Sequence, residues 1–418
     1  MRLRLLTALT VTAGLAFTAC ANDDSADDET ASDPATDRES TTDTDAPSAG
    51  PTDDSPTDDS PTDDSPADDG PTDDSLAVVA GEPFPAERCA ANEAAGTITY
   101  LTGFDFAATA SIVDVLVADA NGYYDELCLD VEITPSFSTA NYPFIAENDA
   151  QFASGGSFSE VVAFAAANDA EFVVTAVEGP TAIDSLILKP GVAAGLEDLA
   201  GSTIGVKGKL PPSVAAMLAT AGLTENEDYE TVLIDGFDPV AHIAIESIDG
   251  FPGYKSNEPG TLERNGIAFD LFDPLDYDIP GSFGIVYGNA EFLATHPIAA
   301  EDFMRATMRG LADAIADPRR AAEIAVEAIN AGGNRNFLAP DGEVFRWSTD
   351  AALITELTPD GVGFGVPDVD ALQDELDAYA AVGLFGEGET PNAADFLVDL
   401  LDRIYGADGT VVWPAAGS

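Results

Sequence analysis

The chain has few basic residues, few cysteines and few histidines, and each shortage argues against a class of function. Its 418 residues include 16 Lys and Arg against 76 Asp and Glu, which gives a formal net charge of -60. Binding to nucleic acid requires clustered basic side chains and is excluded, and docking on an anionic membrane through a basic face is disfavoured. With three cysteines and two histidines, a zinc site rich in these residues and a small disulfide scaffold are both disfavoured.

Long apolar runs are also scarce, and the first one resembles an export signal. Residues 1–4 are a short basic start, and residues 5–17 are an apolar stretch shorter than the ~20 residues of a membrane-spanning helix. Small residues then lead to Cys20, as in a bacterial lipoprotein signal, where the cysteine is lipidated and becomes the new N-terminus. Ordinary secretion, with cleavage near Ala19 or Ala21, is the alternative.

Residues 21–75 contain no apolar residue larger than Ala or Pro, so they lack the side chains of a folded core. They carry 20 acidic residues and one Arg, and the sequence Pro-Thr-Asp-Asp-Ser begins at residues 51, 56, 61 and 71. A period of five residues matches neither a solenoid nor a coiled coil. We interpret the segment as a disordered acidic spacer, spanning about 40 Å if flexible, that holds a folded domain off a membrane.

From residue 96 onward, apolar runs typical of strands alternate with amphipathic segments typical of helices. Predicted strands cover residues 97–101, 129–133, 151–154, 172–177, 185–189, 203–207, 231–235, 250–254, 267–272 and 283–287. Predicted helices cover residues 108–121, 157–168, 212–221, 239–247 and much of 289–405, including 394–405. This alternation indicates parallel sheets, and about 320 residues exceed one such core, so two α/β lobes are expected.

Ligands of open parallel sheets bind beyond the carboxyl ends of the strands, and those ends combine glycine, aromatic and polar residues in this chain. The candidates in the first lobe are Phe104, Asp105, Phe106, Gly155, Gly156, Ser157, Phe158 and Glu178. The candidates in the second lobe are Lys207, Tyr254, Asn257 and Glu258. The glycines at 155 and 156 either present free amides to an oxyanion or carbonyl, or form an ordinary strand-to-helix turn.

The order of several motifs gives the chain a resemblance to a known family. The motifs are Asp105-Phe106, Val117-Ala118-x-x-x-Gly122-Tyr123-Tyr124, Leu129-Asp130-Val131, Gly205-Val206-Lys207-Gly208 and Gly253-Tyr254-Lys255-Ser256-Asn257-Glu258-Pro259. Together they resemble motifs of the nitrate, sulfonate and thiamine-pyrimidine-precursor binding proteins, which are solute-binding lipoproteins of ABC importers. The resemblance covers residues 96–330.

The resemblance implies a type II periplasmic-binding fold, in which a ligand cleft separates two α/β lobes, with a hinge near 185–189 and a return near 272–284. The expected organisation is a signal peptide at 1–20, a disordered linker at 21–92, lobe 1 at 93–186, lobe 2 at 187–280, and the rest of lobe 1 with C-terminal helices at 281–418. The implied partners are a small-molecule ligand, an ABC permease and its ATPase. A monomeric, non-enzymatic protein without metal or cofactor is expected, lipid-anchored at the outer face of the cell membrane.

The residues leave the ligand open between a flat heterocycle and a small anion. Thiamine-precursor binders usually carry Trp and a His where this chain has Phe106 and Ile112, so a related heterocycle such as a flavin suits the cleft about as well. Such a ring would stack on Phe106, Phe158 and Tyr254, while Asn257 and Glu258 bond its ring nitrogens or amino groups.

The alternative ligand is a sulfonate or nitrate, because Lys207, Lys209 and Lys255 border the predicted cleft. The acidic composition and the lack of any arginine between Arg88 and Arg264 favour a neutral or cationic heterocycle. A minor alternative is an enzyme like the synthases of the thiamine pyrimidine. Those enzymes use a cysteine-rich segment and an active-site histidine, which have no counterpart in this sequence.

Lipidation of Cys20 would leave Cys89 and Cys128 as an even pair in an oxidising compartment, which predicts a disulfide. Cys89 precedes the first predicted strand and Cys128 the second. If these strands are parallel neighbours, both cysteines lie at the same edge of the sheet, whereas two buried free thiols are the alternative.

The lipid is expected to be lost in a Cys20→Ser variant. Wild-type protein should remain in the membrane fraction and partition into detergent, whereas the variant should be released, because a thioether-linked lipid needs the cysteine sulfur. Equal release of both proteins from membranes would contradict lipidation.

Overall fold

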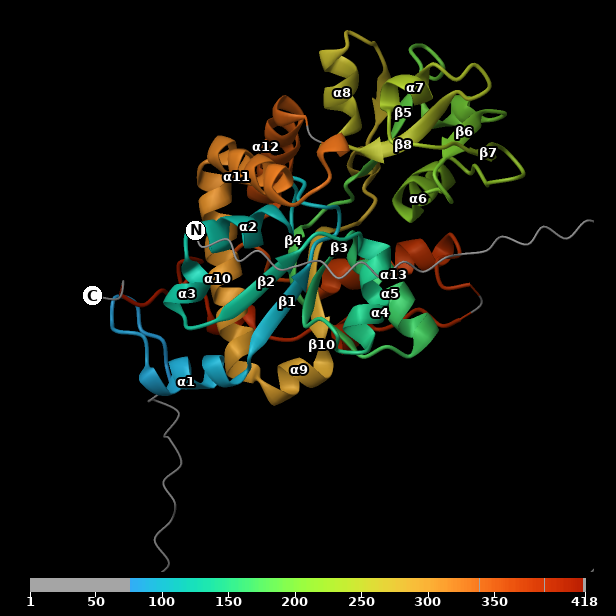
Figure 1. Cartoon of the computed structure of the whole chain (residues 1–418). Coiled ribbons are helices and arrows are strands. Elements are labelled where there is room, and N and C mark those ends of the chain that lie inside the picture. The colour runs from blue at the N-terminus through green and yellow to red at the C-terminus, as the bar shows by residue number, and fades with distance from the viewer. Residues whose placement is uncertain (1–75, 338, 387, 416–418) are drawn as a thin grey trace, which may run out of the picture. The chain divides into compact units, whose positions relative to one another are not determined.

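The computed structural model describes residues 76–337, 339–386 and 388–415 of the chain (Figure 1). The predicted signal segment, Cys20 and residues 21–75 of the predicted linker lie outside these residues. The described residues form helices and two sheets. None of the described helices is long and apolar enough to cross a membrane.

Two five-stranded sheets are the centres of two lobes, which confirms the predicted two-lobed α/β fold (Figure 1). The strand order in lobe 1 is β2 (Asp130–Thr134), β1 (Thr97–Leu101), β3 (Phe152–Gly155), β10 (Phe283–Asn289) and β4 (Phe172–Gly179). The strand order in lobe 2 is β7 (Glu230–Leu233), β6 (Thr203–Val206), β8 (Gly250–Tyr254), β5 (Asp184–Leu188) and β9 (Asp270–Phe272).

One strand in each sheet runs against its neighbours. β10 is antiparallel to β3 and β4, and β5 is antiparallel to β8 and β9, whereas β1 and β6 are parallel to both of their neighbours. β5 and β10 are the strands that the chain enters directly after crossing from the other lobe. A crossing segment arrives at the edge where the parallel strands end, so the strand that follows it runs in the opposite direction through the sheet. The sheets are therefore mixed rather than purely parallel.

The two crossovers define the boundary between the lobes. Residues 180–183 join β4 to β5, and residues 273–282 join β9 to β10, within the expected return. The predicted start of lobe 2 at residue 187 is too late, and so is the predicted hinge at 185–189. Asp184–Leu188 is already a strand of the second sheet, paired with β8 and β9.

Helices cover the sheets of both lobes. Those of lobe 1 are α1 (Ala86–Ala94), α2 (Val113–Ala120), α3 (Tyr123–Glu126), α4 (Ser138–Ala146), α5 (Phe158–Asn168), α9 (Ala290–Thr295), α10 (Pro297–Ala316), α11 (Pro318–Ala331), α12 (Pro340–Leu357) and α13 (Val369–Ala381). Those of lobe 2 are α6 (Pro212–Thr220), α7 (Pro239–Ile243) and α8 (Glu258–Arg264). α12 and α13 also reach lobe 2, where they contact α8 and α6 respectively (Figure 1).

Residues 394–405, predicted as a helix, contain only two 3₁₀ turns, η5 (Ala393–Phe396) and η6 (Leu401–Arg403). Leu397, between the two turns, forms a bridge with Val174 of β4, which lies at the edge of its sheet. An extended residue that pairs with a strand cannot continue a helix, so this contact overrides the helical apolar pattern.

Lobe 1 begins earlier in the chain than predicted. α1 lies within the predicted linker 21–92, and its Arg88 is buried. The Arg88 guanidinium donates to Glu301 at 2.5 Å and to Asp302 at 2.6 Å, and Arg305 pairs with the same two carboxylates. A buried arginine requires such partners, so α1 is part of the folded lobe rather than of the spacer.

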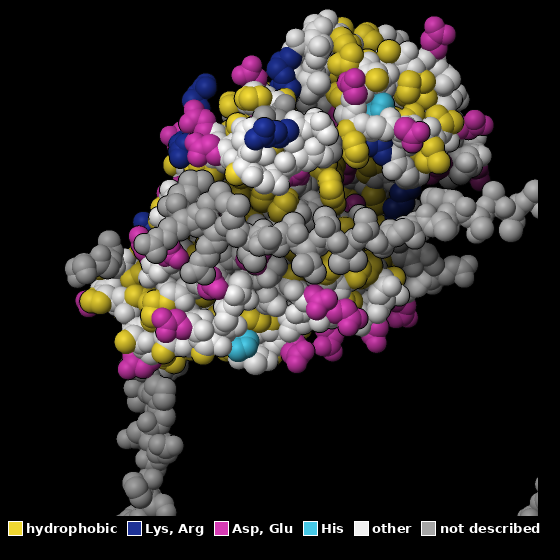
Figure 2. Space-filling model, in the orientation of Figure 1, with side chains coloured by type: hydrophobic (Ala, Val, Ile, Leu, Met, Phe, Trp, Pro, Cys, Tyr) yellow, Lys and Arg dark blue, Asp and Glu magenta, His cyan; other side chains and the backbone are white. Residues whose placement is uncertain are grey.

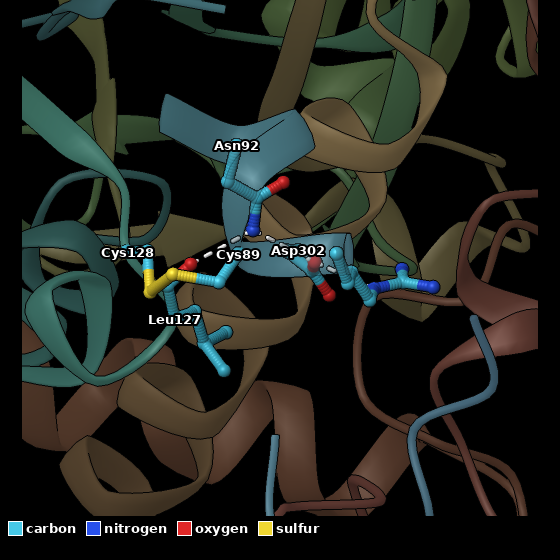
Figure 3. Close-up of a disulfide and its surroundings, with 6 residues drawn as sticks. Cys89, Asn92, Leu127, Cys128 and Asp302 are labelled. Atoms are coloured by element: carbon cyan, nitrogen blue, oxygen red, sulfur yellow. Dashed lines mark hydrogen bonds and ion pairs between the residues drawn. A yellow bond between two sulfur atoms is a disulfide. The ribbon is translucent and has the colours of Figure 1, made fainter. Parts of the chain in front are cut away.

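A disulfide and an asparagine fix α1 to the segment before β2 (Figure 3). Cys89 of α1 and Cys128 are bonded through their sulfur atoms, as the sequence argument expects. The Asn92 side chain donates to the Leu127 carbonyl at 2.8 Å and to Asp302 at 2.9 Å. β1 and β2 are parallel neighbours, so the residues before each strand lie at one edge of the sheet.

Removing the disulfide is expected to destabilise the protein. The bond joins residues 39 positions apart, and closing such a loop contributes about 4 kcal/mol at 25 °C in the chain-entropy model. The double variant Cys89→Ser, Cys128→Ser should lose a free energy of unfolding of that order in urea titrations. Two titratable thiols from this pair in denatured, unreduced wild-type protein would contradict the bond.

Candidate functional site

The loops that follow the strands of the two lobes meet across the lobe boundary. Phe104 follows β1, and its ring centre lies 6.3 Å from that of Phe237, which follows β7. In the middle of the boundary, Tyr254 ends β8 and Asp184 begins β5, and the two residues are directly opposite in the sheet. The surfaces that these loops turn toward each other form the candidate ligand site, which is called the cleft below.

Three phenylalanines form the aromatic side of the cleft. Phe104 meets Phe137 edge-on, with ring centres 5.7 Å apart, and also meets Phe237 of lobe 2. Phe137 and Phe237 are 44% and 60% exposed. The Lys207 ammonium lies 5.1 Å from the centre of the Phe237 ring. Exposed rings supplied by both lobes are suited to stacking on a flat ligand.

Carboxylates and a tyrosine form the acidic side of the cleft. The Glu258 carboxylate accepts a hydrogen bond from the Tyr254 backbone N–H at 2.8 Å. The Tyr254 side chain is 47% exposed. Burial, followed by the negative charges of Glu160 and Glu258, raises the pKa of Asp184 to about 7. Glu258 is buried and its two oxygens are bonded to Tyr254 and Lys207, so the half-buried Asp184 is the group that this side offers to a ligand with N–H or O–H groups.

The acidic groups are not confined to the cleft. Asp and Glu side chains are spread over the face seen in Figure 2, with few Lys and Arg among them. A negative surface of this kind disfavours the approach of an anionic ligand.

Every lysine of the chain is described by the structure, and three of the four already have partners in contact. Lys207 pairs with Glu258 at 3.4 Å, Lys255 pairs with Asp273 at 2.9 Å, and Lys189 donates to the carbonyls of Ile245 and Ile248 at 2.5 Å. The fourth, Lys209, acts on Glu160: burial raises the pKa of that carboxyl, and the Lys209 charge opposes the shift. The lysines that border the cleft are thus compensated by nearby carboxylates.

Three predicted ligand residues of lobe 1 face the protein interior instead. Phe106 and Phe158 belong to the hydrophobic cores, where they are 8% and 0% exposed. The Asp105 carboxylate accepts from the backbone N–H groups of Phe106 at 2.7 Å and Asn334 at 2.6 Å. Asp105 therefore fixes the loop after β1 to the segment after α11.

Gly155, Gly156 and Ser157 lie at the turn from β3 into α5. The Ser157 hydroxyl caps α5 by accepting from the Glu160 N–H at 3.2 Å. The next two amides are also bonded within the protein, Phe158 N–H to the Ser282 hydroxyl at 2.8 Å and Ser159 N–H to the Glu375 carboxylate at 3.0 Å. These first amides of α5 are therefore not free to hold an oxyanion.

An arginine from the C-terminal part of the chain reaches the lobe boundary, contrary to the expectation that none lies near. Arg346 of α12 donates to the Asn257 side-chain oxygen at 2.7 Å and to Glu343 at 2.5 Å. The Asn257 side-chain oxygen is therefore already bonded within the protein, while the hydrogen-bond-donating N–H groups of its amide remain on the other side of the group. Chain order places Arg346 far from the predicted cleft, and only the folding of α12 onto lobe 2 brings it there.

Glu178, another predicted ligand residue, is buried in lobe 1 beside Asp114. Its carboxylate accepts from the Ser111 N–H at 2.9 Å, and the two acidic side chains are 1% and 0% exposed. Burial raises the pKa of Asp114 to about 6 and that of Glu178 well above its usual value, and the charge of Asp114 adds to the shift of Glu178. The pair therefore holds a proton near neutral pH.

Among the residues that the structure describes, no group of three or more His, Cys, Asp or Glu side chains is arranged to hold a metal ion.

Comparisons with known proteins agree with the class that this fold and cleft define, a two-lobed solute-binding protein. The family model described as NMT1/THI5 like matches residues 109–321. The chain belongs to this NMT1/THI5-like family of solute-binding proteins, which confirms the resemblance to the nitrate, sulfonate and thiamine-precursor binders.

A relative among characterised proteins is the riboflavin-binding protein RibY of Chloroflexus aurantiacus, which is 33% identical over 138 residues. The alignment covers 32% of this chain and 39% of RibY, so this chain matches well under two thirds of that protein.

Two solved structures of similar fold are sulfonate-binding proteins. The alkanesulfonate-binding protein SsuA from Xanthomonas axonopodis pv. citri, bound to MOPS, has a TM-score of 0.52 and 12% identity, with 72% of this chain and 98% of that chain covered. The periplasmic aliphatic sulphonate binding protein SsuA from Escherichia coli has a TM-score of 0.54 and 10% identity, with 72% and 92% covered. At these identities the likeness establishes the fold alone.

The buried Asp114–Glu178 pair predicts that stability falls as the pH rises. The folded protein retains a proton on Asp114 up to about pH 6, whereas the unfolded chain releases it near 3.8. The stabilisation of the folded protein by this proton is therefore complete below pH 4 and is lost as the pH rises through 6. The non-ionisable variant Asp114→Asn should gain about 1–3 kcal/mol over wild type between pH 4 and pH 8 in urea unfolding.

The matched control is Asp360→Asn, at an exposed turn residue, which should leave the difference from wild type constant with pH. The shared-proton account is contradicted if Asp114→Asn and wild type lose stability in parallel over this range.

Proposed function

We propose that the protein is the extracytoplasmic solute-binding component of an ABC importer. It captures a small planar heterocycle, with a flavin favoured over a thiamine pyrimidine precursor, and delivers it to a permease and its ATPase. The observation that carries this proposal is the approach of Phe104 and Phe237, from opposite lobes, to 6.3 Å between ring centres. Rings placed on both lobes can stack on the two sides or edges of one flat ligand, so its binding favours closure.

The polar side of the cleft supports a ligand rich in hydrogen-bond donors. Asp184 and Glu258 lie beside Tyr254, and carboxylate oxygens accept hydrogen bonds from N–H and O–H groups. Riboflavin combines a flat ring, a ring N–H and a chain of hydroxyls without a net charge. The 33% identity with the riboflavin-binding protein RibY over 138 residues adds support for this class.

A small anion is the second candidate, and the site favours it less. Lys207 and Lys255 are paired with carboxylates, and Arg346 is paired with Glu343 and bonded to Asn257. The first amides of α5 are bonded within the protein. An anion would have to displace an existing carboxylate from one of these cations, which costs the pairing energy of that contact.

Binding without chemical conversion fits the positions of the two histidines. His242 is buried against Phe251, and its Nε2 lies 2.9 Å from the carbonyl oxygen of Asp235, so it is a paired interior residue rather than a surface one. His296 precedes α10. Neither histidine is among the residues that border the cleft.

The N-terminal part of the chain supplies the proposed location. Lipidation of Cys20 would anchor the protein at the outer face of the membrane, and residues 21–75 would act as the acidic tether. A lipid and a long tether together let a monomer reach a permease in the same membrane.

A ligand panel tests the proposal. Riboflavin should raise the melting temperature in thermal unfolding and bind in calorimetry, because a ligand that binds only the folded state stabilises it. Phe237→Ala should weaken riboflavin binding about tenfold, which corresponds to the loss of one ring contact. The Glu258→Ala variant should weaken it as well.

Leu233→Ala is the matched control, because Leu233 is 76% exposed on β7 and has no part in the proposed site. The thiamine pyrimidine precursor, an alkanesulfonate and nitrate complete the panel. If only the sulfonate or nitrate stabilises the protein, and does so equally in Glu258→Ala, the heterocycle assignment is contradicted.

A further inference from the structure

α12 is fixed to lobe 1 by its buried face. Trp347 is fully buried and donates from its indole N–H to the Ala314 carbonyl at 2.8 Å. The Asp350 carboxylate accepts from the Thr109 hydroxyl at 2.5 Å and from the Ala110 N–H at 3.1 Å. These contacts fix α12 to lobe 1, and the Asp350 carboxylate also interacts with the Ser256 side chain of lobe 2.

Another face of α12 meets α8 of lobe 2 (Figure 1). A Cβ atom at Gly260 would lie only 2.4 Å from the Phe345 ring, so the absence of a side chain on α8 permits this approach. The Arg264 guanidinium lies 5.9 Å from the centre of the same ring. The two helices are therefore in direct packing contact across the lobe boundary.

The two terminal guanidinium nitrogens of Arg346 bond to different lobes. One donates to Glu343, which belongs to α12 itself, has a side chain 1% exposed and also accepts from the Ala108 N–H at 2.9 Å. The other donates to Asn257 of lobe 2 at 2.7 Å. Of these two bonds of Arg346, separation of the lobes would break the one to Asn257, because the Glu343 pair lies within lobe 1.

Asn257 belongs to a turn that also lines the cleft. Its backbone N–H donates to the Tyr254 carbonyl at 2.9 Å, and the Tyr254 N–H donates to the Glu258 carboxylate at 2.8 Å. Tyr254 and Glu258 border the cleft, while Asn257 points to α12. A ligand held by Tyr254 and Glu258 therefore fixes the same turn that presents Asn257 to Arg346.

We infer that the Arg346–Asn257 hydrogen bond is an interlobe latch that stabilises the closed state, and that the 254–258 turn couples ligand binding to it. The coupling rests on the proposed function, whereas the latch can be tested without a ligand. Both residues are positioning residues, because they act on the ligand through the turn and the lobes. A latch that forms only on closure lowers the rate of ligand release more than it changes the rate of capture.

The test compares release of riboflavin from wild type and variants by stopped-flow fluorescence. Asn257→Ala should raise the release rate about tenfold and leave the association rate within about twofold. Arg346→Lys keeps a positive charge for Glu343 but loses the planar guanidinium that bonds to Glu343 and Asn257 at once. This variant should accelerate riboflavin release similarly. The double variant should release no faster than the faster single variant, because both changes remove one bond.

Two further variants separate the latch from general damage. Asn257→Asp keeps an acceptor for Arg346 and should release riboflavin no faster than wild type. Arg320→Gln is the matched control, because Arg320 pairs only with exposed Glu323 and Glu327 on α11. Wild-type release rates in Asn257→Ala, or additive effects in the double variant, would overturn the latch.

A distance measurement makes the result independent of the ligand. Nitroxide labels on Glu323→Cys of lobe 1 and Glu227→Cys of lobe 2, both at exposed positions, report the separation of the lobes in the ligand-free protein. Asn257→Ala should shift the distance distribution toward the open state, and Asn257→Asp should not. If riboflavin fails to bind wild type, the flavin assignment fails and this distribution alone decides the latch. An unchanged distribution then overturns it.

Discussion

The ion pair between Lys255 and Asp273 holds together the segments on which the cleft depends. Lys255 follows β8, and its ammonium lies 2.9 Å from the carboxylate of Asp273, at the start of the second crossover. Its backbone N–H donates to the carbonyl of Ile183, in the first crossover, at 2.9 Å. One residue therefore ties the end of a cleft strand to both connections between the lobes. Loss of either partner would leave a largely buried charge without compensation.

This arrangement also explains the chemistry that the cleft presents. Because Lys255 is committed to the crossovers and Lys207 to Glu258, the cations of lobe 2 stabilise the site itself rather than a ligand. The cleft also presents exposed rings and the Asp184 carboxyl group, which lies opposite Tyr254 in the sheet. A neutral, flat ligand with several donors satisfies such groups without displacing an ion pair.

The secondary structure was largely predictable, because most strands and helices carry a clear apolar period. The Cys89–Cys128 disulfide was predicted from the even number of remaining cysteines and their places before the first two strands. The parallel pairing of β1 and β2, which that argument assumed, is present. The direction of side chains beyond a strand end was not predictable. Phe106 and Phe158 turn into the core, while Phe237 stays exposed, although all three follow strands. That choice depends on helices that pack from elsewhere in the chain.

The other features that could not be predicted from the sequence depend on contacts between residues far apart in the chain. Arg346 enters the lobe boundary only because α12 folds back onto α8, and no local pattern around residue 346 signals that contact. Leu397 leaves its helical pattern because it meets the edge of β4. In the same way, Arg88 identifies α1 as part of lobe 1 only once Glu301 and Asp302 are seen beside it.

Native mass spectrometry of the protein, freshly purified from its own cells, tests the central claim most directly. The account predicts a one-to-one complex with a retained small molecule whose mass and absorption spectrum are those of a flavin or a related flat heterocycle. A complex with a sulfonate or another small anion, displaced by no heterocycle, would contradict it.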